Sequence, residues 1–214
     1  MAFSFPKIYP ILDSSFIPSV DRSQFLTRLG KEMTDAGVTL LEYRNKTGPD
    51  AEVLADAEIL RAAMPPQKVK LILDDSVDLV EPLNFDGVHV DAGDLKPGEA
   101  RKLLGPDRIV GTFGGGATGM VAGILAAPAD YFSIGPVFAT RTKQTSSPLI
   151  GMEGIRRLRA EAGVGPVLVA VGGITLATAA EALAAGATVV AVAGAIFRQA
   201  DPAAEFRRWM AELG

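Results

Sequence analysis

Eight short apolar runs, separated by segments with helical spacing, constrain the fold of this chain more than any other feature. Most of the runs are apolar almost throughout, which is typical of strands buried on both faces of a parallel sheet. The sequence therefore predicts a parallel sheet whose strands are joined by crossover helices. The runs are Ile8–Leu12, Val38–Tyr43, Val69–Leu73, Gly87–Val90, Ile109–Thr112, Tyr131–Gly135, Val167–Val171 and Val189–Ala193.

The segments between these runs carry the spacing and the boundary residues of helices. Phe25, Leu29 and Met33 recur every fourth residue, as on one face of a helix. Thr175 is a suitable N-cap for the helix that follows the seventh run. The third connection, around Val77–Pro82, has room for little more than one helical turn.

Eight such units in 214 residues predict an α/β fold, a (β/α)₈ TIM barrel that forms a single domain over residues 1–214. An open doubly wound sheet is the alternative, because the glycine-rich segment Gly111–Gly116 follows a strand as a nucleotide-binding loop would. That segment lacks the lysine of a P-loop and the G-x-G-x-x-G spacing, which favours the barrel.

Composition narrows the chemistry and the partners. The net charge is −4, so we expect no long-range attraction for nucleic acid or for an anionic membrane. The absence of cysteine excludes disulfides, thiol catalysis and thiolate metal sites. No signal-peptide pattern or apolar stretch of roughly 20 residues is present, so we expect a soluble cytoplasmic protein. The sequence leaves open whether the chain forms a homo-oligomer.

Charged side chains gather just beyond the predicted strands, at the positions that line the active site of a barrel. Magnesium takes one or two carboxylates together with water and phosphate oxygens, and arginine or lysine neutralises the remaining charge. The pattern therefore indicates a site for a metal-bound diphosphate. The cations are Arg44, Lys46, Arg141 and Lys143, and the carboxylates are Asp74, Asp75, Asp91 and Asp94.

A second candidate site carries no charge. Gly172-Gly173 follows the seventh run, and Gly194 follows the eighth. Backbone N–H groups of these two loops frequently bind a monophosphate in (β/α)₈ barrels, and glycine lets the phosphate approach the main chain. Two ordinary tight turns are the alternative interpretation.

His89 is the only histidine of the chain. Alternation at the end of its strand decides whether the side chain points into the barrel or toward the rim. We interpret it as a structural histidine that bonds a neighbouring carboxylate. No Ser-His-Asp set and no zinc-ligand spacing accompanies it.

The loops, in this order, resemble those of the thiamin-phosphate synthases. The most specific segment, Gly135–Lys143, is similar to the family's Gly-Pro-x-x-x-Thr-x-Thr-Lys loop. Asp86–Val90 resembles its Asp-Gly-Val-His-Leu strand, and Ala170–Ile174 resembles its Ala-Ile-Gly-Gly-Ile turn. The likeness extends from Tyr9 to Phe197 and so covers nearly the whole barrel.

This resemblance implies a transferase of thiamine biosynthesis that acts on phosphorylated small molecules. It would couple hydroxymethylpyrimidine diphosphate to thiazole phosphate and release diphosphate by a dissociative mechanism. The resemblance implies that Arg44, Lys46 and Lys143 bind the diphosphate during catalysis, and that Asp75 and Asp94 hold Mg²⁺. The implied substrate-binding residues are Glu42, Asp74, Phe113, Thr140, Thr142, Gly173, Ala193 and Gly194.

Three positions on the pyrimidine side depart from the family pattern. Glu42 and Asp74 stand where the family has neutral amides, and Phe113 stands where it has a serine. An added negative charge about 5 Å from a diphosphate costs about 3 kcal/mol at an effective dielectric near 20. A changed substrate is therefore an alternative to the family's reaction.

Three other functions stay open on these residues. An isomerase similar to the thiazole tautomerases of the same superfamily would need a proton-transfer residue and no diphosphate site. A Schiff-base aldolase would use Lys143, which lies too far beyond its strand for the desolvation that such a lysine needs. A non-catalytic barrel that binds phosphorylated ligands would keep the phosphate site without turnover.

Overall fold

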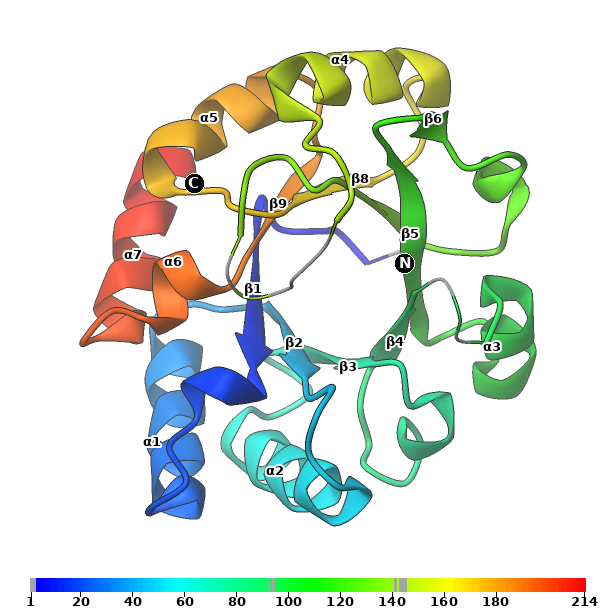
Figure 1. Cartoon of the computed structure of the whole chain (residues 1–214). Helices are drawn as coiled ribbons and strands as arrows, with labels where there is room; N and C mark the ends of the chain where they lie inside the picture. Colours follow the sequence, from blue (N-terminus) through cyan, green and yellow to red (C-terminus); the bar gives the residue numbers. More distant parts are fainter. Residues whose placement is uncertain (1–2, 92, 94, 141, 143–145) are drawn as a thin grey trace.

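The computed structural model describes residues 3–91, 93, 95–140, 142 and 146–214, and its central feature is a closed barrel of eight parallel strands (Figure 1). Neighbouring strands follow the chain order, and β9 pairs with β1 to close the ring. Closure confirms the predicted (β/α)₈ barrel and rules out the open sheet. The strands are β1 Ile8–Asp13, β2 Leu40–Arg44, β3 Lys70–Asp74, β4 Gly87–Val90, β5 Ile109–Gly116, β7 Tyr131–Ile134, β8 Leu168–Val171 and β9 Val189–Val192.

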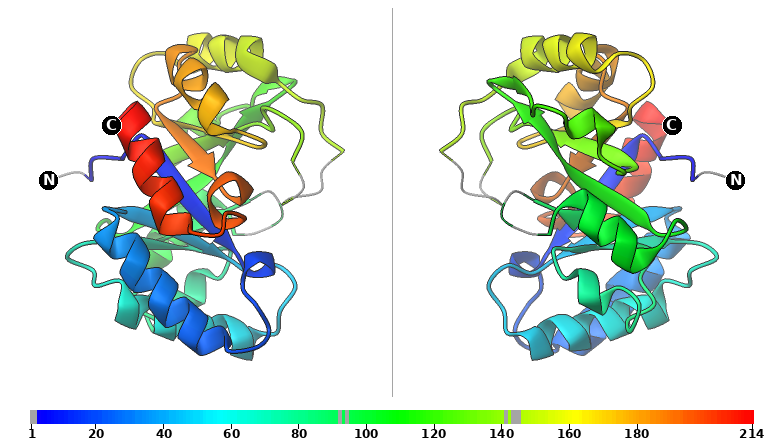
Figure 2. Two further views of the ribbon diagram at one scale, coloured as in Figure 1. Left: turned by 90° about the vertical axis from the view of Figure 1, so that its left-hand side faces the viewer. Right: turned by 90° about the vertical axis from the view of Figure 1, so that its right-hand side faces the viewer.

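Helices cover the outside of the barrel (Figures 1 and 2). The third connection holds a single 3₁₀ turn, as the sequence predicts. The α-helices are α1 Arg22–Asp35, α2 Asp50–Ala63, α3 Pro97–Leu104, α4 Gly151–Ala162, α5 Leu176–Ala184, α6 Gly194–Phe197 and α7 Pro202–Leu213. The 3₁₀ helices are η1 Ser14–Phe16, η2 Val77–Leu79 and η3 Ile124–Ala126.

The buried face of α1 differs slightly from the predicted one. Leu26, Leu29 and Met33 are buried, whereas Phe25 is only partly buried. Leu26 and Leu29 are three residues apart and Leu29 and Met33 four, which is the usual spacing of a helix face. Leu29 and Met33 are therefore buried as predicted, and only at the first turn does Leu26 take the fully buried position expected for Phe25.

Inward-facing side chains from the strands fill the barrel and form a cluster separate from the helix-facing core. Phe3 and Phe5 pack against this cluster, and the Phe5 ring meets the Tyr131 ring edge-on at 5.5 Å. Figure 2 shows the N-terminal segment at the end of the barrel opposite the strands' carboxyl ends. The inward-facing residues are Tyr9, Leu40, Ile72, Ile109, Tyr131, Val169, Val189 and Ala191.

The glycine-rich segment after the fifth predicted strand is part of a hairpin. β5 extends to Gly116, beyond the expected end at Thr112, and pairs antiparallel with the short strand β6, Gly119–Met120. A Cβ on Gly115 would lie 2.9 Å from the Gly119 carbonyl oxygen, so a side chain there would block the pairing. The glycines therefore serve strand pairing at this position.

Candidate active site

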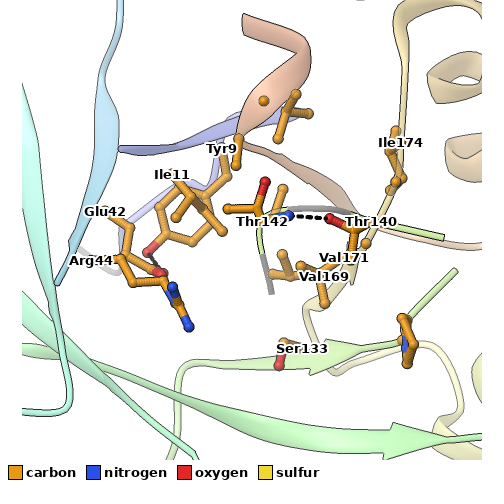
Figure 3. Close-up of a pocket in the computed structure, with 18 of the residues that line it drawn as sticks. Tyr9, Ile11, Glu42, Arg44, Ser133, Thr140, Thr142, Val169, Val171 and Ile174 are labelled. Atoms are coloured by element: carbon orange, nitrogen blue, oxygen red, sulfur yellow. Dashed lines mark hydrogen bonds between the residues drawn. The ribbon is translucent and has the colours of Figure 1, made fainter. Parts of the chain in front are cut away.

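A cavity of about 590 Å³ opens at the carboxyl ends of the barrel strands. Figure 3 shows Glu42 and Arg44 on one side of it, Thr140 and Ile174 on the other, and Thr142 between them. Among the predicted site residues, those that line the cavity are Glu42, Arg44, Asp74, Phe113, Thr140, Thr142, Gly173, Ala193 and Gly194.

Two predicted site residues lie beside the cavity and two are not described. The Lys46 ammonium lies 3.1 Å from Asp74 Oδ2 and also contacts the Asp75 carboxylate. Lys46 and Asp75 therefore do not line the cavity themselves, but Lys46 contacts Asp74, which does. Asp94 and Lys143, predicted for the metal and the diphosphate, lie outside the described residues.

Arginine, lysine and aspartate interleave in what we call the charged half of the site, formed by Asp13, Arg44, Lys46, Asp74 and Asp75. Arg44 and Asp74 line the cavity, and the other three pair with charged neighbours just behind its wall. The Arg44 guanidinium donates to Asp13 Oδ2, and its Nε lies 3.4 Å from Asp74 Oδ2. Two cations thus stand among three carboxylates, a net formal charge of −1. The repulsion predicted at Asp74 is offset, but the same pairing occupies the cations that a diphosphate would need.

Asp13 is a site residue that the sequence prediction missed. It is the last residue of β1, is 5 % exposed, and accepts a hydrogen bond from the Ser15 backbone N–H at 3.0 Å. Residues at the carboxyl ends of barrel strands are expected at the active site, and this expectation would have included Asp13 if it had been applied to the first strand as well. Its carboxylate fixes both the turn after β1 and the Arg44 guanidinium.

Magnesium fits the charged half only together with a substrate. Among the described residues, no group of three or more acidic or histidine side chains is arranged to hold a metal ion. The Asp75 carboxylate, 27 % exposed, lies where one protein oxygen could join water and phosphate oxygens around the ion. A divalent cation would also reverse the net negative charge of this half, so the donor chemistry fits.

A chain of polar contacts crosses the floor of the cavity, and we call it the floor chain. The Tyr9 hydroxyl donates to Glu42 Oε2 at 2.9 Å and lies 3.1 Å from the Tyr131 hydroxyl. The Tyr131 hydroxyl in turn lies 3.0 Å from His89 Nδ1. On its other side, His89 Nε2 lies 3.5 Å from Asp91 Oδ1. His89 thus contacts a neighbouring carboxylate, as interpreted, and lines the cavity as well.

The floor chain holds two groups with raised pKa values. Burial raises the pKa of the Glu42 carboxyl to about 7, because the charged form loses hydration inside the barrel. Burial alone would lower the pKa of His89, but the Asp91 contact and the negative charges of Glu42 and Asp74 raise it overall. Glu42 can therefore carry or release a proton near neutral pH, directly at the wall of the cavity.

The opposite side, which we call the glycine half, consists of Gly172, Gly173, Ala193 and Gly194 with the threonines of the loop after β7. Gly173 has a φ of +63°, and a Cβ there would lie 2.4 Å from the Ala139 carbonyl oxygen. Only glycine fits such a position without strain. The described residues that line this half include no carboxylate. Its polar groups are backbone amides, hydroxyls and one arginine, Arg198.

The sequence prediction also missed Arg198, which lines the cavity. It follows the one-turn helix α6 and does not follow a strand directly, so a rule based on strand ends passes over it. No composition or spacing signal in the sequence distinguishes it from other arginines.

The sequence model of the family described as "Thiamine monophosphate synthase" matches residues 8–196. The thiamine-phosphate synthase of Koribacter versatilis (strain Ellin345) is 39 % identical over 187 residues, covering 87 % of each chain. That of Methanoculleus marisnigri is 32 % identical over 200 residues, covering 94 % of this chain and 92 % of the other. A solved thiamine phosphate pyrophosphorylase from Pyrococcus furiosus superposes with a TM-score of 0.74 at 26 % identity, over 97 % of both chains.

Proposed function

The chain belongs to the thiamine monophosphate synthase family, and from that premise we propose that it joins hydroxymethylpyrimidine diphosphate to thiazole phosphate and releases diphosphate. The observation that carries the proposal is a single cavity with a charged half and a glycine half. Two chemically different places for phosphate suit two phosphorylated substrates. Isomerisation of one substrate would need only one of them.

The charged half would bind the diphosphate substrate. Arg44 and Lys46 would face the diphosphate, together with Lys143, which lies outside the described residues. Mg²⁺, held by Asp75 and by Asp94 outside the described residues, would supply positive charge to the diphosphate when bound. The pyrimidine ring would lie over the floor chain, where the Glu42 carboxyl can accept a hydrogen bond from its amino group. Phe113 would pack against the ring.

The glycine half would bind the thiazole phosphate. The phosphate would meet backbone N–H groups at Gly173, Ala193 and Gly194, and the thiazole ring would contact Thr140 and Thr142. The Thr142 backbone N–H donates to Thr140 Oγ1 at 3.2 Å, which fixes the two threonines relative to each other (Figure 3). The cavity would thus hold both rings at one mouth.

The chemistry proposed here needs positioning more than proton transfer. The bond from the pyrimidine methylene carbon to the diphosphate oxygen breaks, and its electron pair leaves with the diphosphate. The amino group of the ring stabilises the resulting cation, and the thiazole nitrogen uses its lone pair to form the new carbon–nitrogen bond. The protein's contribution is to hold the two reactants together and to stabilise the leaving charge.

A coupled assay tests the proposal. The purified chain, mixed with both substrates and Mg²⁺, is expected to yield thiamin phosphate and diphosphate in equal amounts. Leaving out either substrate should abolish both products, and EDTA should stop the reaction until excess Mg²⁺ is added. Binding of both substrates without any product would contradict the proposal.

A second candidate, a proton-transferring isomerase, is favoured by one observation, the titratable floor chain. Such an enzyme would act on a thiazole phosphate alone. Nuclear magnetic resonance of that substrate in D₂O would show enzyme-dependent exchange of ring protons if this were the activity. We expect coupling with both substrates and no isomerisation of either one.

A further inference from the structure

Arg198 is a cation of the cavity that the proposed function does not use. It lines the cavity beside Gly194. A Cβ added to Gly194 would lie 2.9 Å from Arg198 Nε and 3.6 Å from Thr142 Oγ1. The guanidinium therefore lies directly against the backbone of the glycine half, with the threonine hydroxyl on the same side.

The guanidinium of Arg198 differs from that of Arg44 in its partners. Arg44 is paired with Asp13 and Asp74. In the part of the chain that the structure describes, the Arg198 side chain makes no hydrogen bond and no ion pair. A cation with open donors next to a cavity side without carboxylates is a binding group for an anion.

An aromatic stack holds Arg198 at the cavity mouth. Its guanidinium lies over the Phe16 ring at 5.0 Å from the centroid, and Phe16 stacks on Phe197 at 6.2 Å with an interplanar angle of 20°. Stacking uses the flat face of a guanidinium and leaves the N–H groups at its edge free to donate. The arginine is thus oriented without its donors being consumed.

We propose that Arg198 binds the phosphate of the substrate held by the glycine half and makes that half selective for a phosphate monoester over the corresponding alcohol. The inference rests on the proposed function and deepens it. The parallel N–H donors of arginine match two phosphate oxygens, so Arg198 adds charge where the backbone supplies only dipoles. An unphosphorylated thiazole alcohol would gain nothing from it.

Steady-state kinetics of Arg198→Gln and Arg198→Lys test the inference. We expect R198Q to raise the KM for thiazole phosphate about tenfold to a hundredfold, the usual loss for a hydrogen bond to a charged group. The kcat and the KM for the pyrimidine diphosphate should stay unchanged, because the contact is equal in ground and transition states. R198K keeps the charge and loses the paired donors, so its KM for thiazole phosphate should lie between those of the wild type and R198Q. The matched control is Arg207→Gln, an exposed arginine of α7.

Titration calorimetry separates this inference from the proposed function, because it needs no turnover. Thiazole phosphate and its unphosphorylated alcohol are titrated into the wild type and R198Q. Weakened binding of the phosphate alone supports the inference even if the wild type forms no thiamin phosphate. Equal weakening of both ligands, or an unchanged affinity for the phosphate in a coupling-competent enzyme, would overturn it.

Discussion

The charged half and the glycine half of the cavity share one mouth but differ in how they can hold a phosphate group. Among the residues that the structure describes, the charged half has three carboxylates against two cations, so a diphosphate would need additional positive charge to bind there. The glycine half has backbone amides, hydroxyls and one arginine, and its described lining has no carboxylate. This contrast predicts that any need for a divalent metal belongs to the diphosphate substrate and not to the enzyme as a whole.

The two halves also differ in whether side chains or the backbone form them. The charged half depends on side chains that neutralise one another, so removing one partner leaves a buried charge. The glycine half depends on backbone geometry, so adding a side chain is the disruptive change. The two halves should therefore respond differently to substitution.

Replacing Arg44 should have the largest effect on stability. Arg44→Met leaves the side chains of Asp13 and Asp74, 8 % and 3 % exposed, without their shared cation. Breaking a buried ion pair in this way costs about 3–5 kcal/mol. Urea denaturation at neutral pH measures the loss in the free energy of unfolding.

The control for this change is Arg28→Met, an arginine of α1 with a 68 % exposed side chain. Its effect should stay within about 1 kcal/mol, as for other exposed ion pairs. An R44M protein as stable as the wild type would show that the charged half is not a compensated cluster.

Glu42→Gln should stabilise the protein at alkaline pH. The folded pKa of Glu42 is raised to about 7 from 4.5, so the folded state binds its proton more tightly than the unfolded state does. Stability therefore falls as pH rises from about 4.5 to 7, by about 3 kcal/mol for this shift, and E42Q removes that loss.

The difference between E42Q and the wild type should be near its full size at pH 8 and vanish at pH 4. The exposed Glu58→Gln variant on α2 controls for a general loss of one carboxylate. A constant difference between E42Q and wild type across this range would mean that the buried carboxyl titrates normally.

The glycine half should respond to added methyl groups in a position-dependent way. Gly173→Ala forces a positive φ on alanine and a clash with the Ala139 carbonyl, at a cost of about 1–3 kcal/mol. Gly173→Ala should weaken the binding of thiazole phosphate and leave the affinity for the pyrimidine diphosphate unchanged. Gly194→Ala should cost less, because its nearest atom is the movable Arg198 side chain. Melting curves and calorimetry that gave equal losses for both variants would refute this ordering.

Much of the fold and of the charged half could be predicted from the sequence. Eight apolar runs are enough to predict the barrel, and the barrel then predicts which residues meet at its rim, such as Glu42, Arg44 and Asp74. The pairing within the rim could not be predicted. Asp13 and Arg44 are 31 residues apart, and their contact depends on the register between β1 and β2.

The missed residues share a physical reason. Arg198 lies beside the cavity at the end of the one-turn helix α6, which follows β9, and Phe16 contacts it from η1, which follows the neighbouring strand β1. Such contacts arise from tertiary geometry. The shift from Phe25 to Leu26 on α1 has a similar origin, because the neighbouring elements decide which side of a helix is covered.

Calorimetric binding of each substrate, with Mg²⁺ and with EDTA, tests the contrast between the two halves most directly. Removing the metal should abolish binding of the pyrimidine diphosphate, because the charged half keeps its net negative charge. Binding of thiazole phosphate should be the same in both conditions, because the glycine half supplies its own donors. Equal loss of both affinities, or metal-independent binding of the diphosphate, would contradict the proposed contrast between the two halves.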